Sequence, residues 1–180
     1  MTSQFQTGPY NLRSGISVFP EQQKAIDKIL VNLRQELPAH FLLLGDVTGQ
    51  IVQARGERDN IDLVALGSLM AGDLAASQEI ARLTGEYQNY QMILREGSSK
   101  HTFISEVGHH LILLVQVSND VPLGWARKFI QRTVRQVEDI MANTPLEVQQ
   151  PELEKQLAPM LNQEDLPGLF SDALDDLWTE

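Results

Sequence analysis

The segment from Asp59 to Leu83 is apolar on two opposite sides, and this feature constrains the fold more than any other. Read at the helical period of 3.6 residues, the segment presents two apolar faces. One face carries Ile61, Ala65, Ser68, Leu69, Gly72, Ala76 and Ile80, and the other carries Leu63, Leu66, Met70, Leu74, Ser77 and Ala81. An ordinary surface helix has one apolar stripe and one charged face. We therefore expect the chain's own sheet to cover one side, and more of the same chain or another molecule to cover the other.

Burial of both faces within one chain is the competing interpretation of this segment. Small residues weigh against it, because they fill a monomer core poorly and allow a second helix to approach closely. The segment is rich in such residues: Gly67, Ser68, Ala71, Gly72, Ala75, Ala76 and Ser77. We therefore expect the face that the sheet does not cover to carry the function.

The net charge of −10 is unevenly distributed along the chain. Residues 145–180 hold nine acidic residues and one basic residue, whereas the first 144 residues are nearly neutral. Nucleic-acid backbones and anionic membranes attract clustered Lys and Arg, so we expect neither as a partner. No run of 18 apolar residues is present, so we expect no membrane insertion. Cysteine is absent, which removes disulfides and thiolate metal sites and fits a cytoplasmic protein.

Signatures of catalysis are missing from the sequence. It holds no G-x-S-x-G, H-E-x-x-H or P-loop lysine motif. Asp46 and Glu57 stand near expected turns, but no partner base is identifiable for either. His109 and His110 are adjacent in a turn, so their side chains point apart and do not suggest a metal site. We expect no intrinsic enzyme activity, no metal and no cofactor.

Periodicity and turn residues indicate one domain with extensions at both ends. Residues 1–19 are polar and contain glycine and proline, so we expect a flexible leader. The domain, residues 20–142, is predicted to contain Pro20–Leu37 (helix), His40–Asp46 and Gln50–Arg55 (strands), the two-faced helix, Asn89–Glu96, Lys100–Val107 and His110–Val117 (strands), and a helix to about Met141.

Tight turns join these strands, which favours a five-stranded antiparallel sheet with its most apolar strand, His110–Val117, at the centre. The predicted fold class is α+β, an αββαβββα sandwich. Its two terminal helices should lie on one face of the sheet and the two-faced helix on the other.

The C-terminal region has a different character. Residues 143–164 contain three prolines and few large side chains, and we expect a linker there. Residues 165–180 predict an acidic amphipathic helix, with Asp165 as its N-cap. Its apolar side chains are Leu166, Leu169, Phe170, Leu174, Leu177 and Trp178. A helix this short is not stable alone in water, so it must dock on something to hide these side chains.

Two interpretations of this tail stay open: disorder or docking on its own body, and binding to a partner. The domain's last helix is predicted to carry an outward basic face, formed by Arg127, Lys128, Arg132 and Arg135. This face is either a solvated surface or a docking patch for an acidic partner or for the tail itself.

Three stretches of the sequence, in this order, resemble the roadblock / dynein light-chain family. They are FLLLGDVTGQIVQA, then LVALGSLMAGDLAASQEIARLTGE, then MILREGSSKHTFISEVGHHLILLVQVSNDVPLGWARKFIQRTVRQVEDI. The pattern comprises the D-x-x-G hairpin, the second helix rich in small residues, the E-x-x-x-x-H-x-x-I strand and the P-L-G helix start. It covers about residues 21–142, and within the family it looks most similar to the bacterial members of the mutual-gliding type.

The resemblance implies a homodimer that binds a small Ras-like GTPase. In the family, the strand after the second helix pairs with its dimer mate, and the two second helices lie side by side as a platform. Carried onto this chain, the dimer interface comprises Tyr90, Met92, Leu94, Leu69 and Ala76. The platform that would bind the GTPase comprises Leu63, Leu66, Gly67, Met70, Asp73, Leu74 and Ser77.

Similar bacterial proteins raise the rate of GTP hydrolysis by the GTPase that they bind. The platform here has no central arginine, since Arg58 precedes it and Arg82 stands at its far end, so we do not expect an arginine finger. Ordering of the partner's switch loops would take its place. The alternative function is a dimeric adaptor that anchors a motor, receptor or signalling complex without affecting nucleotide hydrolysis.

Overall fold

A computed structural model describes residues 9–58, 61–85 and 92–143 of the chain. Its elements, in chain order, are β1 (Tyr10–Asn11), β2 (Ser17–Val18), α1 (Pro20–Glu36), β3 (Ala39–Asp46), β4 (Ile51–Gly56), α2 (Leu63–Thr84), β5 (Met92–Glu96), β6 (Lys100–Val107), β7 (Leu111–Ser118) and α3 (Leu123–Ala142). The predicted order of helices and strands within residues 20–142 is confirmed, with boundaries that differ by a few residues. The predicted tail and all of the predicted linker after residue 143 lie outside the described residues.

The main sheet has the strand order β4-β3-β7-β6-β5, and all of its neighbouring strands are antiparallel. Strand β7 is central, as predicted, and every residue from Leu111 to Val115 is buried. A central strand is covered on both faces, so it needs apolar side chains at odd and even positions alike. Strands β4 and β5 form the two edges of this sheet.

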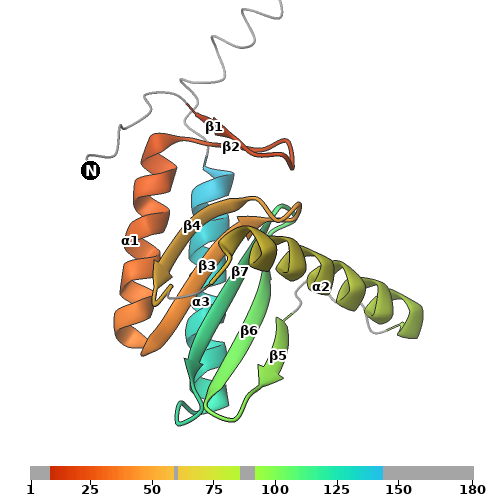
Figure 1. Ribbon diagram of the computed structural model, residues 1–180. Coiled ribbons are helices and arrows are strands. Elements are labelled where there is room, and N and C mark those ends of the chain that lie inside the picture. The colour runs from red at the N-terminus through yellow and green to blue at the C-terminus, as the bar shows by residue number, and fades with distance from the viewer. Residues whose placement is uncertain (1–8, 59–60, 86–91, 144–180) are drawn as a thin grey trace, which may run out of the picture. The chain divides into compact units, whose positions relative to one another are not determined.

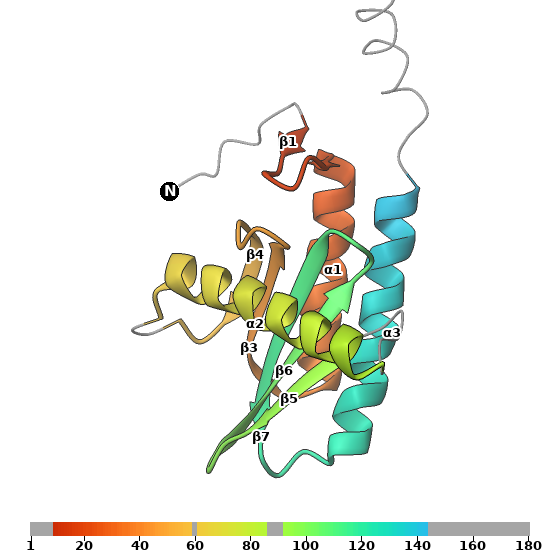
Figure 2. The ribbon, with the colours of Figure 1, turned by 90° about the vertical axis from the view of Figure 1, so that its right-hand side faces the viewer.

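The sheet is covered by helices on both faces (Figures 1 and 2). Helices α1 and α3 pack side by side on one face, and α2 crosses the other. Successive side chains of a strand point to opposite faces, so Leu42 joins the core under α1 and α3 whereas Leu43 joins the core under α2. This arrangement confirms the predicted α+β fold class. No helix in the described ranges is long and apolar enough to cross a membrane.

The N-terminal segment differs from the prediction of a flexible leader. Residues 10–18 form a small hairpin of β1 and β2, with Tyr10 opposite Val18. Leu12 and Val18 are buried in the core under α1 and α3. The polar composition of the segment concealed these two anchors, because a short hairpin needs only one or two buried side chains to fix it to a domain. Residues 1–8, the rest of the predicted leader, are not among the described residues.

Candidate functional site

The two-faced helix, α2, begins and ends on residues suited to those positions. Asp62 precedes its first turn, and the carboxylate accepts hydrogen bonds from the backbone N–H groups of Val64 and Ala65 at 3.0 and 3.1 Å. These donors have no partner inside the helix, so the cap stabilises its start. Gly85 closes the helix with a left-handed backbone, φ 75°, which glycine adopts without a Cβ clash.

The turn between β3 and β4 fixes where the first half of α2 lies. Gly67 of the helix sits directly against this turn, and a Cβ atom placed on it would lie 2.4 Å from the carbonyl oxygen of Gly49. No side chain larger than hydrogen fits there without movement of the helix or the turn. Gly49 itself has φ 87°, a conformation that glycine adopts without strain. The turn of the D-x-x-G hairpin is therefore the surface on which the first half of α2 packs, and we call this turn the seat of the helix.

Asp46 holds this turn in shape. The carboxylate is fully buried and accepts hydrogen bonds from the backbone N–H groups of Thr48 and Gln50, at 2.9 and 2.8 Å, and from the Thr48 hydroxyl at 2.7 Å. It also accepts a hydrogen bond from the backbone N–H of Ser14, at 3.0 Å, and so ties the β1–β2 hairpin to the same turn. Burial raises the pKa of Asp46, but the hydrogen bonds from Thr48, Gln50 and Ser14 outweigh it and leave the pKa below its ordinary value.

The inner face of α2 packs on the sheet, and this corrects part of the predicted GTPase platform. Met70 and Leu74 are 1% and 2% exposed and lie in the core with Leu43, Ile104 and other sheet residues. Gly67 is buried as well. The prediction that these three residues face a partner is wrong, because they form the helix's contact with its own sheet. An arginine at position 70 would test folding and not partner binding.

The other four predicted platform residues are partly buried. Leu63 and Leu66 pack against the core under α2. Asp73 and Ser77 lie at its border and are partly exposed. Binding of a partner by these four residues stays a prediction.

Asp73 makes a contact that the sequence analysis missed. Its carboxylate accepts two hydrogen bonds from Arg95, from Nε at 3.1 Å and from Nη2 at 2.7 Å, and this ion pair joins α2 to β5. The carboxylate keeps the pKa of Arg95 above its ordinary value through these hydrogen bonds. A lone acid between Gly72 and Leu74 in an apolar helix was the available signal, since such an acid needs a partner.

The outer face of α2 is the candidate functional site. The side chains of Val64, Leu69, Ile80 and Leu83 are 62–73% exposed, a degree unusual for large apolar residues on one helix. Ala76 is exposed beside them. Figure 1 shows that α2 runs across the sheet and extends beyond β5, and no residue of α2 after Leu74 is buried. Within the described residues, the second half of this helix therefore has little cover on any side.

Strand β5 is an edge strand next to this helix. On its inner side it pairs with β6, from Met92 opposite Ser105 to Glu96 opposite His101. Met92 and Leu94, both predicted to lie in a dimer interface, are half-buried and pack on the core under α1 and α3. Tyr90, predicted with them, lies outside the described residues. The outer edge of β5 offers backbone N–H and C=O groups of the kind that pair with another strand.

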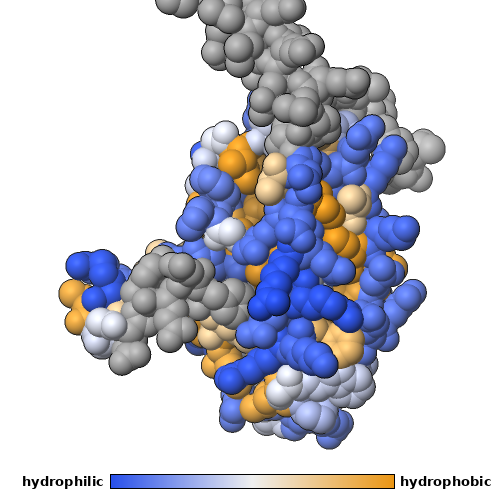
Figure 3. Space-filling model, turned by 180° about the vertical axis from the view of Figure 1, so that it is seen from behind, coloured by the Kyte–Doolittle hydropathy of each residue, from blue (hydrophilic) through white to orange (hydrophobic). Residues whose placement is uncertain are grey.

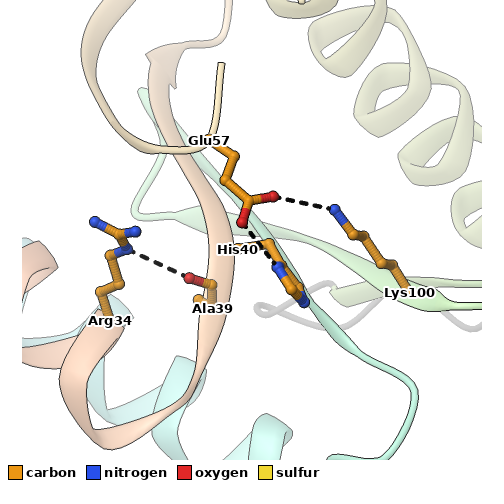
Figure 4. A network of polar contacts seen from close by, with 5 residues as sticks. All are labelled: Arg34, Ala39, His40, Glu57 and Lys100. Carbon is orange, nitrogen blue, oxygen red and sulfur yellow. Dashed lines mark hydrogen bonds and ion pairs between the residues drawn. The ribbon is translucent and has the colours of Figure 1, made fainter. Parts of the chain in front are cut away.

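Of the charged contacts elsewhere, the cluster around Glu57 is the most connected (Figure 4). Its carboxylate lies 3.5 Å from Nδ1 of His40 and 3.4 Å from Nζ of Lys100, and these contacts lower its pKa. Arg34 donates to the carbonyl oxygen of Ala39 nearby, at 3.4 Å. The cluster ties the ends of β3 and β6 to the segment after β4 at the surface. Among the described residues, no group of three or more acidic residues and histidines is placed to hold a metal ion.

Comparison with solved structures identifies relatives of this fold. MglB of Myxococcus xanthus is 29% identical, and the match covers 66% of this chain and 96% of that one, with a TM-score of 0.62. The gliding protein MglB of Thermus thermophilus is 23% identical over 71% of this chain and 96% of that one, with a TM-score of 0.64. A Roadblock/LC7 domain from Streptomyces avermitilis is 17% identical over 65% of this chain and 98% of that one, with a TM-score of 0.59.

No protein-family model and no curated protein sequence matches the chain. The likeness to these solved structures covers 65–71% of this chain and nearly the whole of each matched chain. The αββαβββα sandwich is thus the fold of roadblock-family, MglB-like proteins.

Proposed function

We propose that this protein is a dimeric regulator that binds a small Ras-like GTPase through the outer face of α2 and stimulates its GTP hydrolysis. The observation that carries the proposal is the row of exposed apolar side chains on a helix whose inner face already packs on the sheet. Exposed apolar surface of this kind is typical of protein–protein contacts. The similarity to MglB, named a gliding protein in one relative, supports a role in bacterial motility and cell polarity.

Helical geometry divides the outer face of α2 into two flanks. At about 100° per residue, Leu69, Asp73 and Ile80 fall on one flank, and Val64 and Ala75 fall on the other. Asp73 binds Arg95 of β5, so the flank of Leu69 is turned toward that strand. We assign the Leu69 flank, together with the free edge of β5, to a second copy of the chain, and the Val64 flank to the GTPase.

A two-fold interface uses each contact residue twice. Burial of one leucine side chain contributes about 1.5–3 kcal/mol, so the two copies of Leu69 together contribute about 3–6 kcal/mol to dimer formation. Ala76 lies at the crest between the flanks, where a small side chain lets two helices approach. Pairing of two β5 strands adds backbone hydrogen bonds to this contact.

The proposed mechanism relies on shape. Arg82, the one arginine of α2, donates to Glu79 at 2.8 Å through Nε, and Arg58 donates to the carbonyl oxygen of Ala54. Neither points to a role as an arginine finger. Stimulation would therefore come from packing of apolar side chains against the switch loops of the GTPase, which orders them for hydrolysis. The protein itself would have no catalytic group, and we place the complex in the cytoplasm, which the absence of cysteine supports.

A matched pair of variants tests the proposal. Leu69→Asp and Val64→Asp each put one carboxylate on an exposed apolar position of the same helix. The measurements are mass by light scattering and single-turnover GTP hydrolysis by the small GTPase of the same organism. We expect Leu69→Asp to be monomeric, and Val64→Asp to remain dimeric but to lose stimulation.

Other outcomes separate the remaining interpretations. Binding of the GTPase without faster hydrolysis would favour the adaptor that anchors a larger assembly. If Val64→Asp stimulated as well as the unchanged protein, the assignment of its flank would be wrong. If neither substitution changed mass or hydrolysis, the outer face of α2 would not be the functional surface.

A further inference from the structure

The outward side of α3 carries aromatic and basic side chains, on the face of the sheet opposite α2. Five of them follow one another at helical spacing and line one hollow of the surface: Trp125, Lys128, Phe129, Arg132 and Arg135. We call these five residues the Trp125 stripe. Figure 3 shows this side of the molecule, where hydrophobic surface lies among strongly hydrophilic side chains.

The aromatic part of the stripe is held in place by contacts with its neighbours. The rings of Trp125 and Phe129 meet edge to face with centroids 5.6 Å apart. The guanidinium of Arg132 lies 4.7 Å from the centroid of the Phe129 ring and also forms an ion pair with Glu36 of α1. The hollow is thus formed before a partner arrives, which lowers the entropy cost of binding.

Trp125 does not serve the core of the domain. Its side chain is 47% exposed, whereas the buried side of α3 is filled by Ala126, Ile130, Val134 and Val137. Tryptophan and arginine are among the residues most enriched at the energetic centres of protein contacts. The hollow beside Trp125 is therefore suited to an apolar side chain of a partner.

The cations of the stripe select the charge of that partner. Lys128 and Arg135 are exposed, and neither forms an ion pair with any residue in the described ranges. No acidic residue of the described part of the chain lines the hollow. Carboxylates placed opposite these cations would complement the charge of the surface, which raises the association rate and excludes basic partners.

Nucleic acid and anionic membrane also meet aromatic and basic side chains, but the surface suits them less well. Bases of a single strand stack on open aromatic faces, whereas Arg132 already covers the ring of Phe129. The chain's net charge of −10 opposes the approach of large phosphate arrays. A short peptide meets mainly the local charge of the stripe, because salt screens charges more than about 8–10 Å away.

We propose that the Trp125 stripe binds a short, acidic amphipathic helix of another protein. A second hollow, between α1 and α3, adjoins the first at Arg132 and Gln136, so the surface suits an elongated occupant. From Trp125 to Gln136 the helix α3 rises about 16 Å, which corresponds to about three turns of a partner helix. Its apolar side would cover the two aromatic rings, and its carboxylates would meet the cations of the stripe.

This contact goes beyond the proposed function because it uses the other face of the sheet. Helix α2 lies on the face opposite α3, so a partner on the stripe leaves the outer face of α2 free. The protein can then hold two different partners at the same time, and it would bring them together.

A labelled peptide tests the contact. The probe is a fluorescein-labelled helix of about 14 residues, with leucine and phenylalanine at positions i, i+3, i+4 and i+7 and glutamate elsewhere. Its fluorescence anisotropy is measured during titration with the full-length protein. We expect saturable binding that weakens as salt is added. A matched peptide with lysine in place of every glutamate has the same apolar side and should not bind.

Three variants locate the binding surface. Trp125→Ala should weaken binding of the acidic peptide about 30-fold, the size typical of a residue at the centre of a contact. Arg135→Glu should weaken it about tenfold or more, because attraction becomes repulsion. The control Arg127→Glu makes the same change of charge on the same helix but outside the hollow, and its effect should stay below about twofold. All three positions are exposed, and circular dichroism confirms that each variant is folded.

The proposal is overturned if the acidic peptide does not bind, or if the lysine peptide binds equally well. Equal losses in Arg135→Glu and Arg127→Glu would also overturn it, because overall charge and not the hollow would then attract the peptide. Displacement of the peptide by phosphatidylserine vesicles or by oligothymidine would assign the stripe to a membrane or to nucleic acid instead.

Discussion

Replacing Gly67 by alanine tests whether the D-x-x-G turn is the seat of α2. Alanine is about 1 kcal/mol better than glycine inside a helix, so propensity alone predicts stabilisation. The structure predicts the opposite, because the new Cβ would lie 2.4 Å from the carbonyl oxygen of Gly49 and 2.7 Å from Cδ1 of Ile51. Relief of the first contact, to an ordinary van der Waals distance of 3.4 Å, needs movement of about 1 Å by a helix that is also packed through Met70. Such overpacking costs about 1–3 kcal/mol.

The matched control is Gly124→Ala in the first turn of α3, where a Cβ atom would meet nothing within 4 Å. We expect the free energy of unfolding of Gly67→Ala to be about 2 kcal/mol below that of Gly124→Ala. With a urea dependence of about 2 kcal/mol per M, the two midpoints should differ by about 1 M. Both curves are measured at one protein concentration, since dimer formation would add to apparent stability. Equal midpoints would refute the seating argument.

Three further predictions concern the same helix and its seat. Asp46→Ala should lower the free energy of unfolding by about 3 kcal/mol or more, because hydrogen bonds to a charged group contribute about 1.5–3 kcal/mol each. Asp46→Asn keeps one acceptor oxygen, so its free energy of unfolding should fall by less. Equal losses of the two variants in urea unfolding would contradict this. The pKa of Asp46 in the folded protein lies below its ordinary value of 3.8, so the carboxylate's contribution to the free energy of unfolding is complete above pH 3.8. This contribution is lost as the pH falls through the pKa of the folded state. The stability of Asp46→Asn should therefore lack this part of the pH dependence in acid unfolding. Gly85→Ala should cost about 1 kcal/mol by thermal unfolding, because φ is 75° there; an unchanged melting temperature would show that the cap relaxes.

Much of the fold could be predicted because local signals agreed with the tertiary arrangement. The run from Leu111 to Val115 is apolar at every position, which only a strand covered on both faces requires, and β7 is central. Asp62 supplies a carboxylate that accepts hydrogen bonds at the start of α2, and Gly85, which has no Cβ atom, adopts the left-handed backbone at its end. In these cases the physical cause of the local structure lies in the residue itself and in its neighbours in sequence.

The orientation of α2 could not be predicted from local sequence, because it depends on a contact between residues that are distant in sequence. Both of its faces are apolar, so periodicity alone does not say which one meets the sheet. The contact between Gly67 and Gly49 decides it, and with it the burial of Met70 and Leu74. Side-chain volume was a usable signal, because a core must be filled and leucine and methionine fill it better than alanine. The face with the larger side chains was therefore the better choice for the sheet.

The corrected orientation makes the outer face of α2 a surface of small residues bordered by large ones. Ala65, Gly72 and Ala76 run along its crest, and a Cβ atom on Gly72 would meet nothing within 4 Å. Small side chains allow close approach of another backbone, and the leucine and isoleucine beside them supply apolar area once it arrives. Neither property serves a monomer, in which these residues remain in water. The sequence pattern that is hardest to place in one chain is thus the one that a second molecule explains best.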